Sequence, residues 1–208
     1  MIITDTMLDD LRSSVKESLS DFRWSHTAGV ERMAERLAQI FAPERANELR
    51  AAALLHDITK ERSTDEHIEI LKANGVKVTD DDKRSPKTLH AKTAEFEAKS
   101  AFSEFTNDKI CQSLRYHTTG NKDMTLFDAI IYLADYIEDT RTFEDCVKLR
   151  EYFWSAEPQD MSKESRERHL WQTVLLSLDM TVRDIESVGG YISVETLEAH
   201  EAIEKRLK

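Results

Sequence analysis

The stretch that decides the fold is Ala51-Ala52-Ala53-Leu54-Leu55-His56-Asp57-Ile58-Thr59-Lys60, an apolar run that ends in an imidazole and a carboxylate. The alanines and leucines predict a buried helix, with His56 and Asp57 at its end. A buried carboxylate is costly unless it is paired or bound to a metal ion. We therefore expect Asp57 to have a partner, and divalent metals of the iron, manganese, cobalt and zinc type bind both kinds of side chain.

The dipeptide alone does not decide between two interpretations. His56 and Asp57 are equally compatible with a helix cap and a histidine whose hydrogen bonds are satisfied by the protein. Neighbouring helical residues point about 100° apart, so the pair can share a metal only if the metal lies beside the helix end. The choice depends on whether the chain carries further ligands elsewhere.

The composition predicts an all-α fold. The 208 residues are enough for one domain with a sizeable core, and 5 glycines and 3 prolines are few for a sheet with many tight turns. Helix formers dominate, and no alternating strand pattern stands out. We predict a helical bundle of about ten helices with no substantial sheet.

The charge limits the class of partner. A net charge of −11 opposes the general phosphate attraction by which most proteins bind polymeric nucleic acid. A small phosphate-bearing substrate remains compatible with this charge if metal ions and a few lysines or arginines make a local positive site.

The cysteines and the apolar runs indicate the compartment. Cys111 and Cys146 have no metal-knuckle spacing, and we interpret both as small core residues in a reducing environment. We find no signal peptide and no apolar run of about 18 residues that would span a membrane. A cytoplasmic protein is expected.

Apolar periodicity and capping signals place the expected helices along the chain. Ser63 and Glu66 form a predicted capping box. Three acidic residues within 79–84 lack the pattern of an EF-hand, so this segment is predicted to be a solvated loop. The helices are expected at about 7–19, 26–41, 43–57, 63–74, 86–96, 110–117, 126–137, 143–154 and 163–188, with a last one after Ser193.

Several histidines and aspartates lie at the ends of expected helices or within apolar ones, where a ligand can face a cleft. Three other histidines, at positions 67, 169 and 200, fall among charged neighbours and are expected to take no part in the chemistry. Of these, His67 is expected to face solvent. The candidates for a shared site are His26, His56, Asp57, His90, His117 and Asp135.

Taken in order, these residues resemble the HD superfamily of metal-dependent phosphohydrolases. The similarity is closest to its YqeK-type branch, which cleaves dinucleoside tetraphosphates symmetrically. It spans roughly residues 22–141 and continues more weakly through 196–199. Asp139 departs from the pattern, because many relatives have proline there, and this puts the turn before Arg141 in doubt. The matching pieces are Arg23–Val30, Ala53–Lys60, His90, Tyr116–Gly120 and Leu133–Arg141.

The resemblance implies roles for individual residues. A first divalent metal, iron in the first place, would be bound by His26, His56, Asp57 and Asp135. For His90 and His117 it leaves two roles open: neutral imidazoles could hold a second ion, and protonated ones could donate to phosphate oxygens. One or two ions per chain are thus expected. Catalytic roles fall to Asp57 and Lys60, and substrate-binding roles to Lys60, Arg141, Thr27, Thr118 and Thr119.

The implied activity is cleavage of diadenosine tetraphosphate, and of related dinucleoside tetraphosphates, to two ADP by a metal-activated water. Three alternatives stay open: hydrolysis of another nucleotide, a metal-containing nucleotide sensor with little turnover, and a helical scaffold with a histidine-rich core. We expect one domain over residues 1–208, with the metal-site core at about 22–141 and the helices of 142–208 packed on it. A homodimer is compatible with the sequence.

Overall fold

The computed structural model describes residues 2–208, and these residues form helices without a strand. The predicted all-α fold is therefore confirmed. Four short 3-10 turns join or precede some of the helices. The described α-helices are α1 Asp5–Ser18, α2 Asp21–Phe41, α3 Ala46–Leu55, α4 Thr64–Ala73, α5 Asp80–Arg84, α6 Leu89–Ala101, α7 Asp108–Tyr116, α8 Leu126–Ile137, α9 Glu144–Ser155, α10 Lys163–Ser187 and α11 Val194–Leu207.

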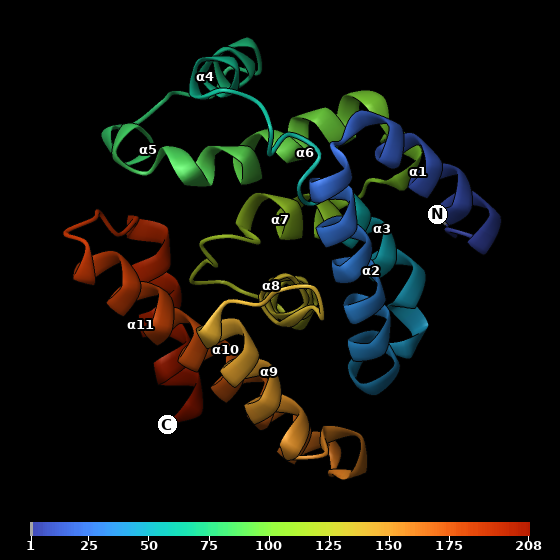
Figure 1. The fold of residues 1–208 in the computed structure, drawn as a ribbon, viewed down its shortest axis with the longest axis vertical. Coiled ribbons are helices and arrows are strands. Elements are labelled where there is room, and N and C mark those ends of the chain that lie inside the picture. The colour runs from blue at the N-terminus through green and yellow to red at the C-terminus, as the bar shows by residue number, and fades with distance from the viewer. Residues whose placement is uncertain (1) are drawn as a thin grey trace.

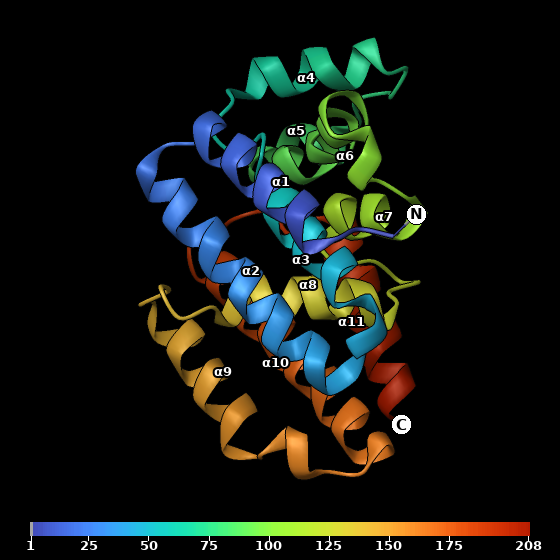
Figure 2. The same ribbon diagram turned by 90° about the vertical axis from the view of Figure 1, so that its right-hand side faces the viewer.

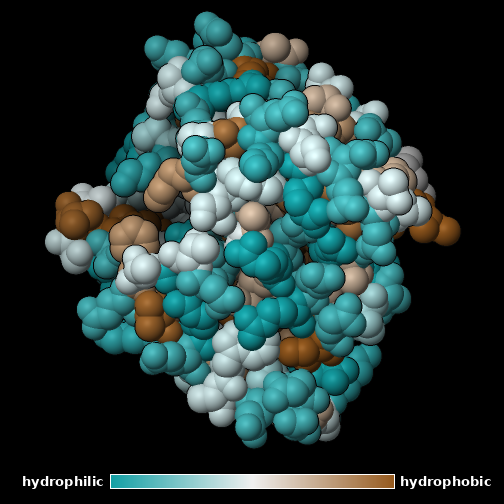
Figure 3. All heavy atoms as spheres, turned by 45° about the vertical axis from the view of Figure 1, so that its right-hand side comes forward, coloured by the Kyte–Doolittle hydropathy of each residue, from teal (hydrophilic) through white to brown (hydrophobic). Residues whose placement is uncertain are grey.

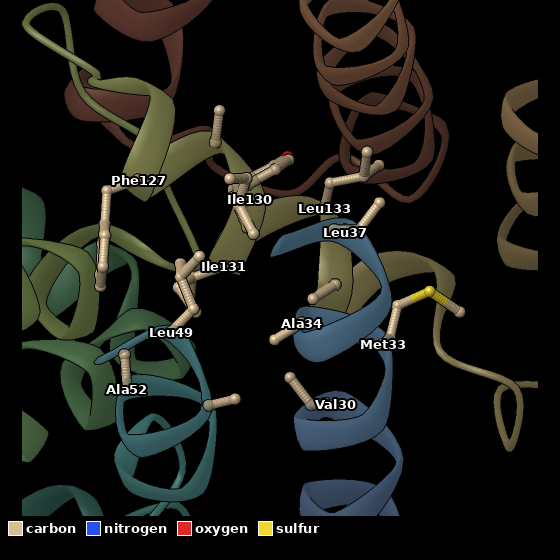
Figure 4. Packing of buried hydrophobic residues seen from close by; sticks show 14 of the residues in the cluster. Val30, Met33, Ala34, Leu37, Leu49, Ala52, Phe127, Ile130, Ile131 and Leu133 are labelled. Atoms are coloured by element: carbon tan, nitrogen blue, oxygen red, sulfur yellow. The ribbon is translucent and has the colours of Figure 1, made fainter. Parts of the chain in front are cut away.

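Helices α2, α3 and α8 pack on one another and carry much of the core, with α8 in the middle of the view in Figure 1. The small side chains of Ala51, Ala52 and Ala53 are fully buried and allow the neighbouring helices to approach closely. From α8, Ile130 and Ile131 are likewise fully buried. They belong to one continuous core with apolar side chains of α2, and Figure 4 shows part of it, including Ala52, Ile130 and Ile131. Burying them contributes the dominant favourable free energy of folding.

The remaining helices cover this centre on two sides. Helix α4 lies across one end of the molecule, and α9 and α10 lie toward the opposite end (Figure 2). Helix α10 packs against α8, α9 and α11, so the C-terminal helices are joined directly to the central layer. None of the described helices has both the length and the apolar content needed to cross a membrane. On the face shown in Figure 3, apolar residues form only small, separate groups.

Most predicted helix limits agree with the structure. Ser63 accepts from the backbone N–H of Glu66, whose side chain in turn accepts from the N–H of Ser63, so the predicted capping box is confirmed. Cys111 and Cys146 are buried free thiols, as expected. Helix α2 begins earlier than predicted, because Ser20 caps it by accepting from the N–H of Arg23.

The prediction of a solvated loop at 79–84 is wrong. These residues form the short helix α5, capped by Thr79 and Asp82. The Asp82 carboxylate is 3% exposed and is paired with Lys92 of α6. One carboxylate of an acidic run that looks suited to solvent is thus buried in an ion pair. Helix α5 is the additional helix that the predicted ten did not include.

Candidate metal centre

Five separate segments of the chain bring six side chains of the kinds that can bind metals to one place. The histidine of α2 lies in its second turn, and the His-Asp pair follows α3, where the chain leaves the helix in a series of turns. The other three lie in the first turn of α6, directly after α7, and in the last turn of α8. All sequence-predicted ligand candidates therefore meet: His26, His56, Asp57, His90, His117 and Asp135.

The four imidazoles are anchored in the same way, each through its Nδ1 atom. His56, His90 and His117 each donate Nδ1–H to the backbone carbonyl three residues earlier, at 2.6, 2.8 and 2.8 Å. His26 donates Nδ1–H to Oε1 of Glu138 at 3.1 Å. In the neutral form of each ring, a proton on Nδ1 leaves a lone pair on Nε2, which is the atom that each ring turns toward the others. This tautomer is the one that binds metal ions through Nε2.

The first group of donors lies around Oδ2 of Asp57. This oxygen is 3.8 Å from Nε2 of His26 and 3.5 Å from Nε2 of His56. Oδ1 of Asp135 completes the group, at 3.0 Å from Nε2 of His26 and 3.9 Å from Nε2 of His56. Each of the two nitrogens thus lies within 4 Å of both carboxylates, and this donor set suits a divalent transition metal.

The second group lies around the other oxygen of the same carboxylate. Oδ1 of Asp57 is 3.3 Å from Nε2 of His90 and 3.5 Å from Nε2 of His117. The two Nε2 atoms are only 3.1 Å apart, and two lone pairs at this distance repel unless a cation or a proton lies beside them. The ammonium group of Lys60 lies 2.9 Å from Nε2 of His90 and supplies such a charge. Asp57 thus presents one carboxylate oxygen to each of the two groups.

The centre also contains polar atoms that the protein does not satisfy. Within residues 2–208, Nε2 of His26, Nε2 of His56 and Oδ1 of Asp57 are buried without a hydrogen-bond partner. The 3.0 Å approach of His26 to Asp135 lacks the alignment of a hydrogen bond. Buried polar groups are rarely left unpaired in native proteins, and ions are a common explanation where they are. The residues therefore fit a bound divalent metal.

Arginines stabilise the two carboxylates from the outer side. Arg23 donates to Oδ2 of Asp57 at 2.7 Å, and Arg141 donates its Nε–H to the backbone carbonyl of Asp135 at 2.6 Å and a second N–H to the carboxylate. Burial opposes ionisation of both acids, but His56 beside Asp57, and Arg141 and His26 beside Asp135, hold the pKa of each carboxyl well below its usual range. Both side chains are thus anionic and ready to bind a cation.

Glu138 belongs to the centre, although the sequence analysis did not single it out. Its side chain is fully buried and accepts from His26 and from the N–H and hydroxyl of Thr140. Burial lowers the pKa of His26, but the carboxylates of Asp135 and Glu138 raise it to about 9. A carboxylate behind a metal-binding histidine orients the ring and increases its basicity. The position of Glu138, directly after α8 and three residues beyond Asp135, was the one feature of the sequence that could have indicated this role.

The approach of Glu138 requires glycine at position 29. A Cβ atom at Gly29 would overlap Oε2 of Glu138 and lie 2.9 Å from its Cδ. We expect Gly29→Ala to push the carboxylate away from His26 and to weaken metal binding by about 10- to 100-fold, the usual effect of losing such an outer partner. Competition with a chelating dye measures the change.

A double-mutant cycle with Glu138→Ala provides the control for the Gly29 prediction. If both changes act through the same carboxylate, the double variant should bind metal no more weakly than Glu138→Ala alone. Simple addition of the two losses would contradict the prediction.

The remaining predicted residues are placed unequally. Lys60 and Thr118 lie at the centre, with the Thr118 hydroxyl 3.1 Å from Nε2 of His90. Thr27 is fully buried and lines neither of the two pockets that adjoin the centre. Thr119 is directed away, because its hydroxyl donates to the carbonyl of Gly120 and, at 3.2 Å, to Glu195 of α11. The structure thus brings Lys60 and Thr118, but neither Thr27 nor Thr119, to the cluster.

Glu195 fixes the loop that follows α7. Besides Thr119, it accepts from Arg115 at 2.6 Å and lies 3.5 Å from the ammonium group of Lys92. The loop carries His117 at its start. Helix α11 therefore supports one side of the metal centre, although it lies far along the chain from the other contributors.

The three histidines set aside in the sequence do not join the cluster. The prediction that His67 faces solvent is wrong, because its side chain is buried and shares a 2.8 Å hydrogen bond with Thr93. His169 is also buried, and it stacks on Phe153. His200 pairs with Asp179 at 2.7 Å near the surface. Each has a partner within its own part of the fold.

Comparison with known proteins gives a consistent result. The family model described as the HD domain matches residues 23–140. A symmetrical bis(5'-nucleosyl)-tetraphosphatase of Bacillus subtilis is 30% identical over 142 residues, which cover 68% of this chain and 75% of that protein. A protein of the same name from Halalkalibacterium halodurans is 31% identical, over 65% of this chain and 71% of its own.

A solved structure is similar over almost the whole chain. It is a crystal structure from Clostridium acetobutylicum, described as a predicted HD superfamily hydrolase involved in NAD metabolism. The two structures agree with a TM-score of 0.82 at 30% sequence identity, and the match covers 95% of this chain and 97% of the other. The similarity therefore includes the C-terminal helices, beyond the residues that the family model matches.

Proposed function

Because the chain belongs to the HD domain family, we propose that it is a metal-dependent phosphohydrolase that cleaves diadenosine tetraphosphate, and related dinucleoside tetraphosphates, symmetrically to two ADP. The observation that carries the proposal is the pair of donor groups on either side of Asp57, which could hold two adjacent cations. The relatives named above, which span most of the chain, support the choice of substrate.

We assign the first cation position to His26, His56, Asp57 and Asp135, and propose iron as the native metal. The second position falls to Asp57, His90 and His117. When bound, a divalent metal would lower the pKa of a coordinated water and polarise a phosphoryl oxygen.

The other residues of the centre act on the charge of the substrate. Lys60 and Arg141 face the centre from different sides and are placed to neutralise the phosphate chain. Burial lowers the pKa of Lys60, but the carboxylates of Asp57 and Asp135 oppose this change. The Thr118 hydroxyl is placed to donate to a phosphate oxygen beside His90. For Thr27 and Thr119 we propose a supporting role in place of direct contact with the substrate.

We also propose that residues 1–208 work as one domain. The HD match at 23–140 contains the proposed ligands, whereas Glu195 of α11 holds the loop beside His117. Because the ligands lie within residues 23–140 and α11 holds a loop beside them, we do not expect residues 23–140 to function without the C-terminal helices.

The products of cleavage test the proposed function. The metal-loaded protein should convert diadenosine tetraphosphate to ADP over many turnovers, because a symmetric cut leaves two phosphates on each adenosine. Chromatography of the reaction mixture measures this directly. Formation of ATP and AMP with little ADP would reject the symmetric cut, and a single turnover without further product would indicate a sensing module instead.

A further inference from the structure

A pocket opens on the α2 side of the metal centre. Its volume is about 470 Å³, within the range of small-molecule sites. His26 and Glu138 lie at its inner end, and Arg23 and Arg141 line it. The residues that remain come from the start of α2 and from the segment between α8 and α9.

Two strongly exposed phenylalanines line this pocket. Phe22, in the first turn of α2, is 80% exposed, and Phe143, directly before α9, is 72% exposed. In the part of the chain that the structure describes, the one other exposed phenylalanine, tyrosine or tryptophan is Tyr152, at 42%. Folding gains nothing from leaving a phenyl ring in water, so two such rings beside one pocket indicate a binding role.

Two arginines connect the aromatic part of the pocket to the metal centre. The guanidinium of Arg23 lies 5.9 Å from the ring centre of Phe22 and also donates to Asp57 at the metal centre. Arg141 reaches Asp135 in the same way. A ligand in the pocket would thus meet apolar rings at one end and guanidinium groups and metal-binding residues at the other. A nucleoside 5'-diphosphate has this polarity.

We infer that this pocket binds one nucleoside of the substrate, with its base packed against Phe22 and Phe143 and its phosphates directed past Arg23 and Arg141 toward the metal centre. The inference rests on the proposed function and adds to it the residues that recognise the base. Stacking on a phenyl ring is available to every base, so this site favours nucleotides over inorganic polyphosphate without selecting strongly among bases.

The pocket on the opposite side of the centre differs in character. It is about 300 Å³ in volume and is lined by Lys60, Arg62, Lys87 and His90, with no phenylalanine, tyrosine or tryptophan among its described lining residues. This lining suits phosphate oxygens better than a base. The aromatic rings therefore distinguish the two sides of the centre, and we place the stacked base on the Phe22 side.

Binding of two product-like ligands to the purified full-length protein tests the inference. ADP carries the nucleoside and two phosphates, whereas inorganic pyrophosphate carries the phosphates alone. Phe22→Ala and Phe143→Ala should each weaken ADP binding by about 5- to 150-fold, the range found when a base-stacking ring is removed. Pyrophosphate binding should change less than about 2-fold, because the arginines remain. Isothermal titration calorimetry measures both.

Three further variants separate stacking from other effects. Phe22→Tyr keeps the ring and should retain ADP binding, whereas Phe22→Leu keeps an apolar side chain and should not. Tyr152→Ala removes the exposed ring that does not line the pocket and serves as the matched control. Because Phe22 and Phe143 are exposed, their variants should melt within a few degrees of the unchanged protein, which thermal unfolding verifies.

The possible outcomes separate the two proposals. Symmetric cleavage by the unchanged protein, with ADP binding that ignores both rings, would overturn the base site alone. Equal weakening of ADP and pyrophosphate, or equal ADP binding by Phe22→Leu and Phe22→Tyr, would also overturn it. If the unchanged protein binds ADP no more tightly than pyrophosphate, the base site fails, whereas failure of the proposed function is measured separately by the absence of ADP among the cleavage products.

Discussion

Asp57→Asn is expected to abolish metal binding at both proposed positions and to reduce the rate of hydrolysis by about 1000-fold or more. The carboxylate is the one side chain shared by the two donor groups, with Oδ2 facing His26 and His56 and Oδ1 facing His90 and His117. Bound metal contributes several kcal/mol to the transition state, and about 4 kcal/mol corresponds to 1000-fold in rate. Asparagine keeps the shape but removes the charge on which both positions depend.

Elemental analysis of the purified variant measures this loss without reference to activity. His200→Ala is the matched control, because this histidine pairs with Asp179 near the surface and away from the donor groups. Its metal content should equal that of the unchanged protein. His67, which the sequence predicted to face solvent, is unsuitable as a control, because it is buried and hydrogen-bonded to Thr93. Full metal content in Asp57→Asn would refute the assignment of this residue as the shared ligand.

His90→Ala and His117→Ala are expected to retain one ion and to lose the other. Both rings face Oδ1 of Asp57, whereas the ligands that we assign to the first ion gather around Oδ2. Of the two histidines, His117 also lies close to His56 and Asp135. Burial lowers the pKa of each imidazole, which favours the neutral form that binds metal. The metal content should fall from two ions per chain to one, and hydrolysis should decrease by about 100-fold or more.

The number of bound ions decides whether His90 and His117 bind a second metal ion or donate to phosphate oxygens. If the unchanged protein holds one ion and His90→Ala still holds one, then His90 contacts phosphate and the ammonium of Lys60 supplies the second positive charge. Loss of all metal in either variant would show instead that the two donor groups form a single site. His200→Ala again provides the reference value.

The sequence was most informative where apolar runs contain an acid. The run at 51–55 and the helix at 126–137 have few alternatives to burial, so the central helices and the acids Asp57 and Asp135 could be predicted from pattern alone. The spacing of the histidines identified which helices must converge. It could not show that Asp57 presents a different oxygen to each group, because that depends on how five segments pack.

Other features depend on contacts that no local pattern contains. Glu138 was missed because it follows the end of the apolar helix, where a glutamate is usually exposed. In the structure it reaches His26, because Gly29 has no side chain that would block it. Asp82 was placed in a solvated loop because its partner, Lys92, lies on the next long helix. In each case a distant residue, and not the neighbouring sequence, sets the environment of the carboxylate.

The support that Glu195 gives to the loop after α7 bears on the order of events during synthesis. Every proposed metal ligand leaves the ribosome before Glu195, and N-terminal segments generally begin to fold first. The nascent chain therefore carries all the ligands while Thr119 and Arg115 still lack their acidic partner. We expect stable metal loading to follow the arrival of α11, which makes it a late step that reports on completion of the fold.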